Sequence, residues 1–444
     1  MMNATSLGSS RRLHPTSFHS RCGGHVASTW LQTTLLEAEI HFSLFDEAAK
    51  ENLWLPKPLV GKPHRGAIRV QSCSLEDLSA LRDDYAQLAY GPLLQSLRAH
   101  NNRKPLAPAV DGVALVVLPD YTNLFHQFGS VAMAWAALQE SYRALPDPKN
   151  DGGGAGASPP DASRISIFML SNASLSSTAL LWSPGLAARP PTFVRGSPPP
   201  PPATYSRVVL AQPTTETWWW NVWAPDETDR RPTLRPLIAR LSAALLLLPP
   251  GRPPPLAAQQ HRAVSIALLL RRSPPSDRRI LNDVELLAAL SPTLLASAPS
   301  PDSSKGSGSG GSLPPLRARL IDLSTLDMRA QLAVVQSAGL LVGAHGAGLV
   351  WNLFLPPGAP VVELLNRANM NNYYANHCRW SRRQYRFWQN GNASAEESAG
   401  TDPLTGEPLA PFRNHMRVDV PQVVAKITDV LKEQQTTTFI APPA

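Results

Sequence analysis

Cysteine is scarce in this sequence of 444 residues, with only Cys22, Cys73 and Cys378 present. None of the three lies in a metal-ligand spacing such as C-x-x-C, so the sequence does not indicate a structural zinc site. Because an odd number of cysteines cannot pair completely within one chain, cysteine usage does not fix the redox compartment.

Long apolar runs are also lacking. The run Leu245–Leu248 is ended by two prolines and is far shorter than the ~20 residues that a membrane-spanning helix needs. The stretch Leu332–Leu355 is interrupted by polar residues, including His345, and by several glycines, so we interpret it as buried core. Residues 1–36 contain no acidic residue and no apolar segment typical of a secretory signal, which makes them more similar to a transit peptide.

Charge of one sign does not dominate, since 41 basic residues stand against 33 acidic ones and give a net charge of +8. No block of Lys and Arg and no aromatic RNA-binding motif accompanies this excess, so nucleic acid is not a predicted partner. The mild positive excess instead suits a smaller anionic ligand.

Proline and glycine, in contrast, are abundant, with 45 and 27 residues. Their tracts lack the apolar residues that would offset the entropy of ordering, so we predict flexible surface insertions there. These tracts are Asn150–Pro160, Ser197–Pro202 and Ser297–Pro315. A further tract, Pro249–Pro255, separates two regions of periodic apolar residues and marks the predicted domain boundary. We predict a poorly ordered tail (residues 1–60), an N-terminal α/β domain (61–255) and a C-terminal α/β domain (256–434).

The apolar pattern on both sides of the boundary predicts alternating strands and helices. Before it, strands are predicted at 113–118, 165–170 and 207–211, with a helix over 123–138. After it, the alternation predicts a parallel sheet with right-handed crossovers, whose ligands bind at the carboxyl ends of the strands. The strands predicted there are 264–270, 316–323, 340–343 and 360–365, and the helices are 283–290, 327–338, 346–354, 371–380 and 421–432.

The strand predicted over 340–343 runs directly into three glycines, Gly343, Gly346 and Gly348. Glycines at a strand-to-helix turn let the backbone approach a ligand closely, and the start of the next helix offers free N–H groups to an anion. The pattern therefore fits a phosphate-binding turn. A turn that is rich in glycine only because its segments pack tightly is the alternative.

Two polar residues near this turn favour a ligand site. His345 lies inside the turn, where its imidazole could hydrogen-bond a phosphate or only cap the turn. Glu363 lies in the next apolar strand, where a carboxylate is costly to bury without a partner. A ribose diol would be a suitable partner, and a salt bridge to Arg367 is the alternative.

The separation of Gly343 and Glu363 also resembles a dinucleotide-binding fingerprint, in which an acid about 20 residues after the glycines binds a ribose. The order here is G-x-x-G-x-G, whereas the fingerprint is G-x-G-x-x-G. The motif also follows two predicted βα units instead of opening its domain. An NAD-dependent dehydrogenase therefore stays a minor alternative.

A basic segment, Arg271–Arg279, follows the first predicted strand of the C-terminal domain. Arginines at the carboxyl end of a strand point toward the crevice that holds the glycine turn, and their planar guanidinium groups suit a diphosphate. For Arg271 and Arg279 taken singly, a solvated basic loop is the better interpretation.

Several short motifs occur in a fixed order between residues 264 and 388. They are Arg272-Ser273, Arg278-x-Ile-Leu-Asn282, Arg329-x-Gln331-Leu332, Val342–Leu349 with Phe354–Pro356, Val361–Glu363 and Tyr385–Trp388. This ordered set resembles glycosyltransferase family 61, which includes O-GlcNAc transferases of proteins and plant xylan arabinosyl- and xylosyltransferases.

The resemblance implies a GT-B fold, in which two Rossmann-like domains face a cleft, and a transfer that inverts the anomeric carbon. It implies that Arg272, Arg278, His345 and the backbone of Gly346–Gly348 hold the diphosphate of UDP, and that Glu363 holds its ribose. The donor-binding residues carried over are Arg272, Arg278, Asn282, His345, Gly346, Ala347, Gly348 and Glu363. The sequence lacks D-x-D, the carboxylate pair with which transferases of the other main fold bind a cation, so no essential metal is predicted, and a divalent cation stays the alternative.

The segment Asn123–Phe128 resembles the histidine motif of the same family. An inverting transfer needs a general base near the acceptor hydroxyl, and the resemblance implies that His126 supplies it. Family members usually carry an aspartate four residues later, where this chain has Ser130. His126 then acts alone, Asp120 replaces the missing acid, or the protein is a weak or inactive member.

The tryptophans at 218–220 and 223 form a further cluster. They could stack on an acceptor sugar, and core packing is the commoner role of tryptophan. The sequence leaves both roles open.

The hypothesis from sequence is an inverting glycosyltransferase that transfers GlcNAc, xylose or arabinose from a UDP-sugar to a hydroxyl of a protein or polysaccharide. A nucleotide-sugar-binding pseudoenzyme is the main alternative because of Ser130. The family implies the lumen of the Golgi or endoplasmic reticulum and association with the membrane. No signal anchor is visible, which an incomplete N-terminus would explain.

Overall fold

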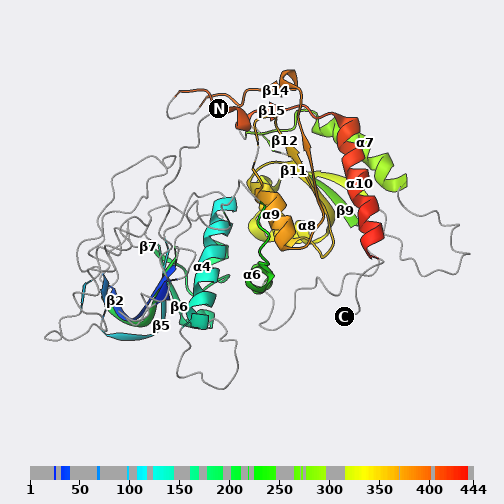
Figure 1. Cartoon of the computed structure of the whole chain (residues 1–444). Helices are drawn as coiled ribbons and strands as arrows, with labels where there is room; N and C mark the ends of the chain where they lie inside the picture. Colours follow the sequence, from blue (N-terminus) through cyan, green and yellow to red (C-terminus); the bar gives the residue numbers. More distant parts are fainter. Residues whose placement is uncertain are drawn as a thin grey trace, which may run out of the picture. The chain divides into compact units, whose positions relative to one another are not determined.

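The computed structural model describes residues 25–26, 32–40, 68–70, 98–99, 108–117, 124–144, 161–169, 178–193, 202–211, 219, 225–246, 265–270, 272–273, 277–296, 316–369, 371–401 and 406–438. The chain divides into two units. Unit 1 is Met1–Thr122, Gly129–Leu175 and Trp182–Thr217, and unit 2 is Asn123–Phe128, Ser176–Leu181 and Trp218–Ala444. Both contain helices and sheets with parallel strands, so the predicted α/β class is confirmed (Figure 1).

Unit 1 contains a mixed eight-stranded sheet with the order β4-β3-β2-β8-β5-β6-β7, in which β1 pairs with β2. Strand β5 (Ala109–Val117) is parallel to β6 (Ile165–Met169) and to β8 (Ala203–Ala211). Strand β8 is antiparallel to β2 (Gln32–Ile40). The short strands are β1 (His25–Val26), β3 (Ile68–Val70), β4 (Arg98–Ala99) and β7 (Thr192–Phe193).

Two features of the chain division differ from the sequence prediction. Strand β2 lies within residues 1–60, where a tail was predicted, because it gains its hydrogen bonds from β8, a partner far along the chain. The last unit boundary falls between Thr217 and Trp218, before the proline tract at 249–255, because helix α6 (Arg231–Leu245) is counted with unit 2.

Helix α4 (Leu124–Ala144) follows β5, as predicted, and is longer than the predicted 123–138. Residues 127–135 are all buried, so this part of the helix is buried on every side. Two short helices complete this region, η3 (Ala162–Arg164) and α5 (Ala179–Trp182).

Unit 2 contains a five-stranded parallel sheet with the order β10-β9-β11-β12-β13. The strands are β9 (Ser265–Leu270), β10 (Leu316–Ile321), β11 (Ala338–Ala344), β12 (Val361–Leu365) and β13 (Tyr385–Gln389). Numbered from β9, the order is 2-1-3-4-5, so the direction of winding reverses between β9 and β11. Sheets of this kind bind ligands at the carboxyl ends of the strands beside that reversal.

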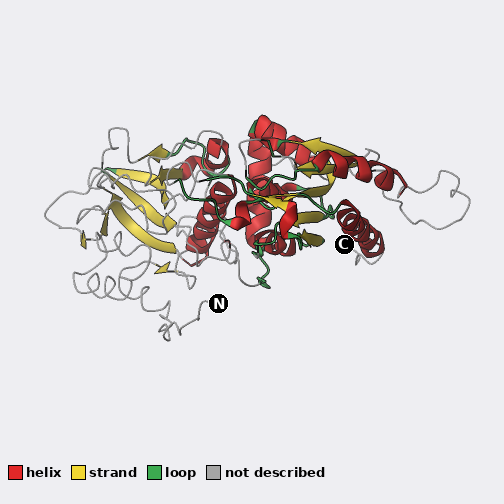
Figure 2. Ribbon diagram, turned by 90° about the horizontal axis from the view of Figure 1, so that it is seen from above, coloured by secondary structure: helices red, strands yellow, loops and turns green. Residues whose placement is uncertain are grey.

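Helices cover both faces of this sheet (Figure 2). One face packs Leu269, Val342 and Leu364 against Leu286 of α7 (Asp283–Ala296) and Ile427 of α10 (Val420–Thr438). Helices α8 (Met328–Gln336) and α9 (Tyr373–Trp380) lie on the opposite face (Figure 1). Strands buried on both faces read as continuous apolar runs, which is why the sequence predicted β9, β11 and β12 closely.

The helix predicted over 346–354 is η9 (Ala347–Phe354), and its type differs from an ordinary α-helix. It is a 3₁₀-helix, and the N–H of Leu349 bonds the carbonyl of Gly346 in the tighter i to i+3 pattern. The smaller elements of unit 2 are η8 (Leu323–Thr325), η10 (Ala393–Ala395), η11 (Pro411–Arg413), β14 (Glu396–Glu397) and β15 (His415–Met416). Within the described ranges, no helix combines the length and the apolar character needed to cross a membrane.

An aromatic cluster of unit 2 surrounds His377 on α9. The His377 ring lies 4.5 Å from that of Trp219, 5.3 Å from that of Trp380 and 5.8 Å from that of Phe125, which stacks on it. Trp219 is 1% exposed, so this tryptophan of the cluster noted in the sequence packs in the core. The other three tryptophans of that cluster lie outside the described residues.

Burial lowers the pKa of His377 to about 3. Below pH ~6.5 His377 therefore binds a proton in the unfolded chain and not in the folded chain, so the free energy of unfolding falls as the pH drops below that value. We expect the free energy of unfolding to lose up to about 1.4 kcal/mol per pH unit from this group between pH 6 and 4.5.

The variant His377→Phe, measured by urea unfolding at pH 7 and 4.5, is expected to lose stability less steeply than the wild type. The variant keeps an aromatic ring among Trp219, Trp380 and Phe125 and removes the titrating group. Equal pH slopes in the two proteins would show that His377 does not titrate in this way.

Candidate functional site

The two motifs singled out in the sequence meet at the reversal point of the unit 2 sheet. Leu270 at the end of β9 pairs with Gly343 of β11. Arg272 follows β9, while His345 and Gly346 follow β11. The fold thus brings the basic segment and the glycine turn to the edge at which such sheets bind ligands.

Gly346 and Arg272 approach each other so closely that no side chain fits between them. A Cβ atom on Gly346 would lie 1.3 Å from Nη2 of Arg272, and the φ of Gly346 is +154°, which residues with side chains rarely adopt. Gly346 precedes η9, whose first N–H groups have no partner within the helix. The hydroxyl of Tyr374 donates to the Gly346 carbonyl over 2.5 Å and fixes the turn.

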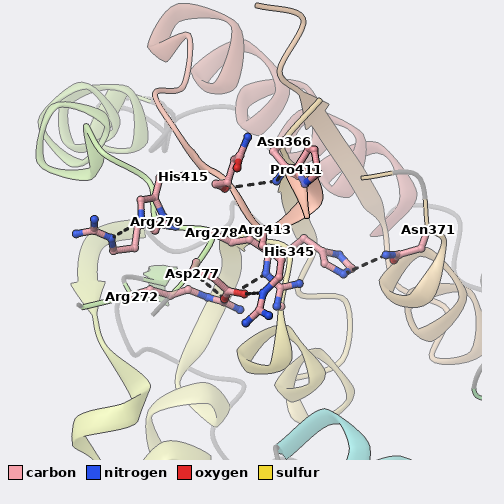
Figure 3. Close-up of polar contacts among 12 residues, drawn as sticks. Arg272, Asp277, Arg278, Arg279, His345, Asn366, Asn371, Pro411, Arg413 and His415 are labelled. Atoms are coloured by element: carbon pink, nitrogen blue, oxygen red, sulfur yellow. Dashed lines mark hydrogen bonds and ion pairs between the residues drawn. The ribbon is translucent and has the colours of Figure 1, made fainter. Parts of the chain in front are cut away.

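Three guanidinium groups gather around one carboxylate beside this turn (Figure 3). Nη1 of Arg272 lies 3.1 Å from Oδ1 of Asp277, Nε of Arg278 lies 3.4 Å from the same oxygen, and Nε of Arg413 lies 2.6 Å from Oδ2. Three positive charges against one negative charge leave a surplus of two within this cluster. Such a surplus next to a helix N-terminus is suited to a phosphate group.

Within this cluster the charge of Arg272 is buried and the backbone of Arg278 is strained. Burial, together with the charge of Arg278, lowers the pKa of Arg272 to about 10, so Arg272 remains protonated at neutral pH. Arg278 has φ +54°, and its N–H bonds the Arg413 carbonyl over 3.0 Å. A non-glycine residue in this region costs on the order of 1–3 kcal/mol, and such strain gathers at functional sites. A bound anion would stabilise the buried charge of Arg272.

The conservative variant Arg272→Lys is expected to weaken UDP binding about tenfold, because an ammonium group cannot make the two-pronged contact of a guanidinium. Isothermal calorimetry measures the change. Arg279→Lys is the matched control, since Nε of Arg279 instead faces the ring of His415 at 3.4 Å. Equal losses in the two variants would indicate a general effect of charge and not a site at Arg272.

His345 belongs to a buried chain of hydrogen bonds. Its Nδ1 forms a short hydrogen bond with Oε1 of Glu363, and the hydroxyl of Tyr385 donates to Oε2 of Glu363 over 2.6 Å. The carboxylate fixes the proton on Nδ1, so Nε2 of the neutral ring carries no proton and can accept a hydrogen bond. Nε2 lies 3.3 Å from Nδ2 of Asn371 (Figure 3).

Burial lowers the pKa of His345, and the charges of Arg278 and Arg272 act in the same direction, while Glu363 opposes them. We therefore expect a neutral imidazole in the free protein at pH 7. A phosphate placed against Nε2 would favour the imidazolium, which can donate to it from that nitrogen while Nδ1 donates to Glu363. Nδ2 of Asn371, which can donate to Nε2 only while the ring is neutral, would then keep its bond to Oδ1 of Asn369.

The side chain of Glu363 is fully buried, and both of its carboxylate oxygens are hydrogen-bonded to other side chains. The partners are His345 and Tyr385, whereas Arg367, the salt-bridge alternative, bonds Glu396 through its backbone N–H over 2.5 Å. The ribose contact inferred for Glu363 thus stays a prediction, and its visible contacts position His345.

Three other predicted site residues have different surroundings. Asn282 exchanges hydrogen bonds with the backbone of Val418, with its Oδ1 accepting over 2.9 Å and its Nδ2 donating over 3.0 Å. These contacts join the segment before α10 to the start of α7. The contact between Asn282 and the sugar-nucleotide stays a prediction. Ala347 and Gly348 are the first two residues of η9, and their contact with a diphosphate stays a prediction.

The candidate base His126 lies in the first turn of α4, in the part counted with unit 2. Its ring contacts Phe125, which packs 5.7 Å from Tyr374, and Tyr374 lies 5.2 Å from His345, all between ring centroids. One aromatic cluster therefore supports both histidines. Ser130, the position of the family's aspartate, is fully buried.

Sequence reasoning missed Asp277, Arg413 and Asn371. Asp277 stands inside the basic segment, so its pairing with the arginines was detectable. Arg413 lies 136 residues after Asp277, and no motif in the sequence around it indicates that the two side chains meet. Among the described residues, no group of three or more His, Cys, Asp or Glu side chains is placed to hold a metal ion.

Comparison with known proteins adds a partial similarity. The chain is 31% identical over 97 residues to the EGF domain-specific O-linked N-acetylglucosamine transferase of Xenopus laevis, which covers 21% of this chain and 18% of that protein. It is 31% identical over 113 residues to the protein of the same name from Drosophila melanogaster, covering 26% and 21%. The similarity suggests a related glycosyltransferase.

The match spans only about a fifth of the length of these relatives, 18% and 21%. No family model matches the chain. The glycosyltransferase similarity therefore agrees with the resemblance inferred from the motifs at the coarse level of enzyme class, and the donor and the acceptor belong to the proposal that follows.

Proposed function

We propose that this protein is an inverting glycosyltransferase that transfers GlcNAc, xylose or arabinose from a UDP-sugar to a hydroxyl of a protein or glycan. The observation that carries the proposal is the surplus of two positive charges around Asp277, beside Gly346 and the start of η9. The partial similarity to O-linked N-acetylglucosamine transferases supports the class of reaction.

The chemistry requires stabilisation of a departing diphosphate. In the proposed step the acceptor oxygen bonds to the anomeric carbon, the bond from that carbon to the β-phosphate oxygen breaks, and UDP leaves with the bonding electrons. Arg272, Arg278 and Arg413 would neutralise the charge that develops on the diphosphate, and preorganised cations in a partly buried site do this efficiently. An imidazolium at His345 would donate to the same group.

The acceptor proton needs a base, and we assign this role to His126. In the proposed GT-B arrangement, His126 would face the acceptor while the sheet edge of unit 2 holds the donor. Because Ser130 is buried and cannot act as a carboxylate, His126 would work without the acid that family members usually carry.

The experiment is a UDP-release assay with UDP-GlcNAc, UDP-xylose and UDP-arabinose, with EGF-domain proteins, mannosyl glycans and xylan fragments as acceptors. We expect acceptor-dependent UDP release with one of these donors, and its loss in His126→Ala. Binding of UDP without turnover on any acceptor would contradict the enzyme and support the alternative, a nucleotide-sugar-binding pseudoenzyme, which the serine at position 130 favours.

A dehydrogenase is less well supported by the fold. The glycine turn follows the third strand of its sheet in chain order, and the carboxylate of Glu363 already bonds His345 and Tyr385. Binding of NAD without binding of UDP would favour it. By the family resemblance, we also propose that the protein works in the lumen of the Golgi or endoplasmic reticulum.

A further inference from the structure

A pair of asparagines follows β12 at the same sheet edge. Asn369 is 2% exposed, and Nε2 of Gln389, at the end of β13, donates to the Asn369 carbonyl over 3.0 Å. The side-chain Nδ2 of Asn371 reaches Nε2 of His345 at 3.3 Å. Gln389 thus fixes the segment that follows β12, and this segment places the side-chain amide of Asn371 beside the proposed phosphate position.

The hydrogen bonds within the pair fix the orientation of both amides. The backbone N–H of Asn371 and its Nδ2 both donate to Oδ1 of Asn369, over 3.4 and 2.8 Å. Oδ1 of Asn369 must therefore be the acceptor, which leaves Nδ2 as the remaining donor. Because Nδ2 of Asn371 is used, its Oδ1 is the remaining acceptor.

Neither remaining atom has a hydrogen-bond partner in the part of the chain that the structure describes, although both atoms are buried. A buried polar group without a partner costs on the order of 1–3 kcal/mol. Such groups are uncommon in native proteins, and each one calls for an explanation such as a missing ion, water or ligand. Here one donor and one acceptor remain within one asparagine pair, next to His345.

We propose that Asn369 and Asn371 bind the vicinal hydroxyls of a sugar ring attached to the diphosphate of the donor. A vicinal diol offers both a donor and an acceptor, which matches the free Nδ2 of Asn369 and the free Oδ1 of Asn371. The inference rests on the proposed function, because the diphosphate must lie against His345 and the arginines. It assigns the diol contact to these amides in place of Glu363, whose oxygens are already bonded.

Two rings of a UDP-sugar carry such a diol, the ribose and the transferred sugar, and one experiment separates them. Binding of UDP, 2′-deoxy-UDP, CDP and UDP-GlcNAc is measured by calorimetry for the wild type, Asn369→Ala and Asn371→Ala. Asn390→Ala is the matched control, since Asn390 is also buried, and its Nδ2 already donates to the Asn392 carbonyl over 3.0 Å and to Glu396 over 3.1 Å.

If the ribose is the ring bound, the wild type should bind 2′-deoxy-UDP about tenfold more weakly than UDP, and both variants should lose this difference while the control keeps it. If the transferred sugar is bound, the variants should weaken UDP-GlcNAc about tenfold relative to UDP. Either pattern supports the proposal. Unchanged ratios in both comparisons, or a change only in the preference for UDP over CDP, would overturn it.

The outcomes also separate this inference from the proposed function. Wild-type protein that binds UDP, with ratios untouched by either variant, contradicts the diol site alone. Wild-type protein that binds neither UDP nor UDP-GlcNAc overturns both. Asn371→Ser serves as the second variant where Asn371→Ala does not fold, because its shorter side chain removes Oδ1 and leaves a polar group at position 371.

Discussion

Gly346→Ala is expected to weaken UDP binding on the order of 100-fold while the sheet of unit 2 stays folded. The added methyl group would lie 1.3 Å from Nη2 of Arg272, so the guanidinium must leave its place, and the φ of +154° disfavours any side chain. Displacing one buried charged partner of a phosphate costs on the order of 2–5 kcal/mol, which is about 30-fold or more in affinity.

Other glycines provide the controls. A Cβ on Gly348 would come no closer than 3.6 Å to Leu270, an ordinary contact, although Gly348 lies in the same turn. A Cβ on Gly391 would meet nothing within 4 Å. Calorimetry should therefore show near-normal UDP affinity for Gly348→Ala and Gly391→Ala. Equal affinity of Gly346→Ala and the wild type would contradict the close approach of Arg272 to the ligand site.

Glu363→Gln is expected to abolish the pH dependence of donor binding. In the free protein the pKa of His345 is lowered, mainly by burial, and a bound diphosphate would raise it. Between these two pKa values binding takes up a proton, so wild-type affinity should rise as the pH falls from 8 to 6, by up to about tenfold per pH unit. Glutamine at position 363 cannot stabilise the imidazolium by charge, so its curve should be flat.

The choice of ligand and controls isolates His345. UDP-GlcNAc is used instead of UDP because each of its phosphates is linked on two sides, by one ester and one anhydride bond, and does not titrate between pH 6 and 8. Arg272, with a pKa of about 10, does not titrate there, and burial raises the pKa of Tyr374 and Tyr385 well above their ordinary values. His345→Ala should also give a flat curve, and His415→Gln should keep the wild-type slope. A wild-type slope retained in Glu363→Gln would contradict the pairing.

The parts of the site that the sequence could predict are those built by neighbours in the chain. Gly346, His345 and Arg272 directly follow strands whose apolar runs are easy to recognise. The sheet topology then places the ends of these strands together, because parallel strands share a carboxyl edge. The same reasoning located most elements of unit 2 within a few residues.

The parts that the sequence could not predict depend on partners far apart in the chain. Arg413 joins Asp277 from a segment far along the chain, and β2 gains most of its pairing from β8, which is more than 160 residues away. The sequence also did not show which groups bond the carboxylate of Glu363. A ribose and Arg367 were the partners considered, and the structure instead shows His345 and Tyr385. A buried carboxylate takes the nearest suitable donors, and the packing of the sheet decides which these are.

The central claim is that the edge between β9 and β11 binds the diphosphate of a uridine nucleotide. Calorimetric titration of the wild type and Gly346→Ala with UDP, UMP and NAD tests it most directly. We predict that UDP binds the wild type more tightly than UMP and far more tightly than NAD, and that Gly346→Ala removes the advantage of UDP over UMP. Equal binding of UDP and UMP by the wild type, or an advantage of UDP that survives in Gly346→Ala, would contradict the account.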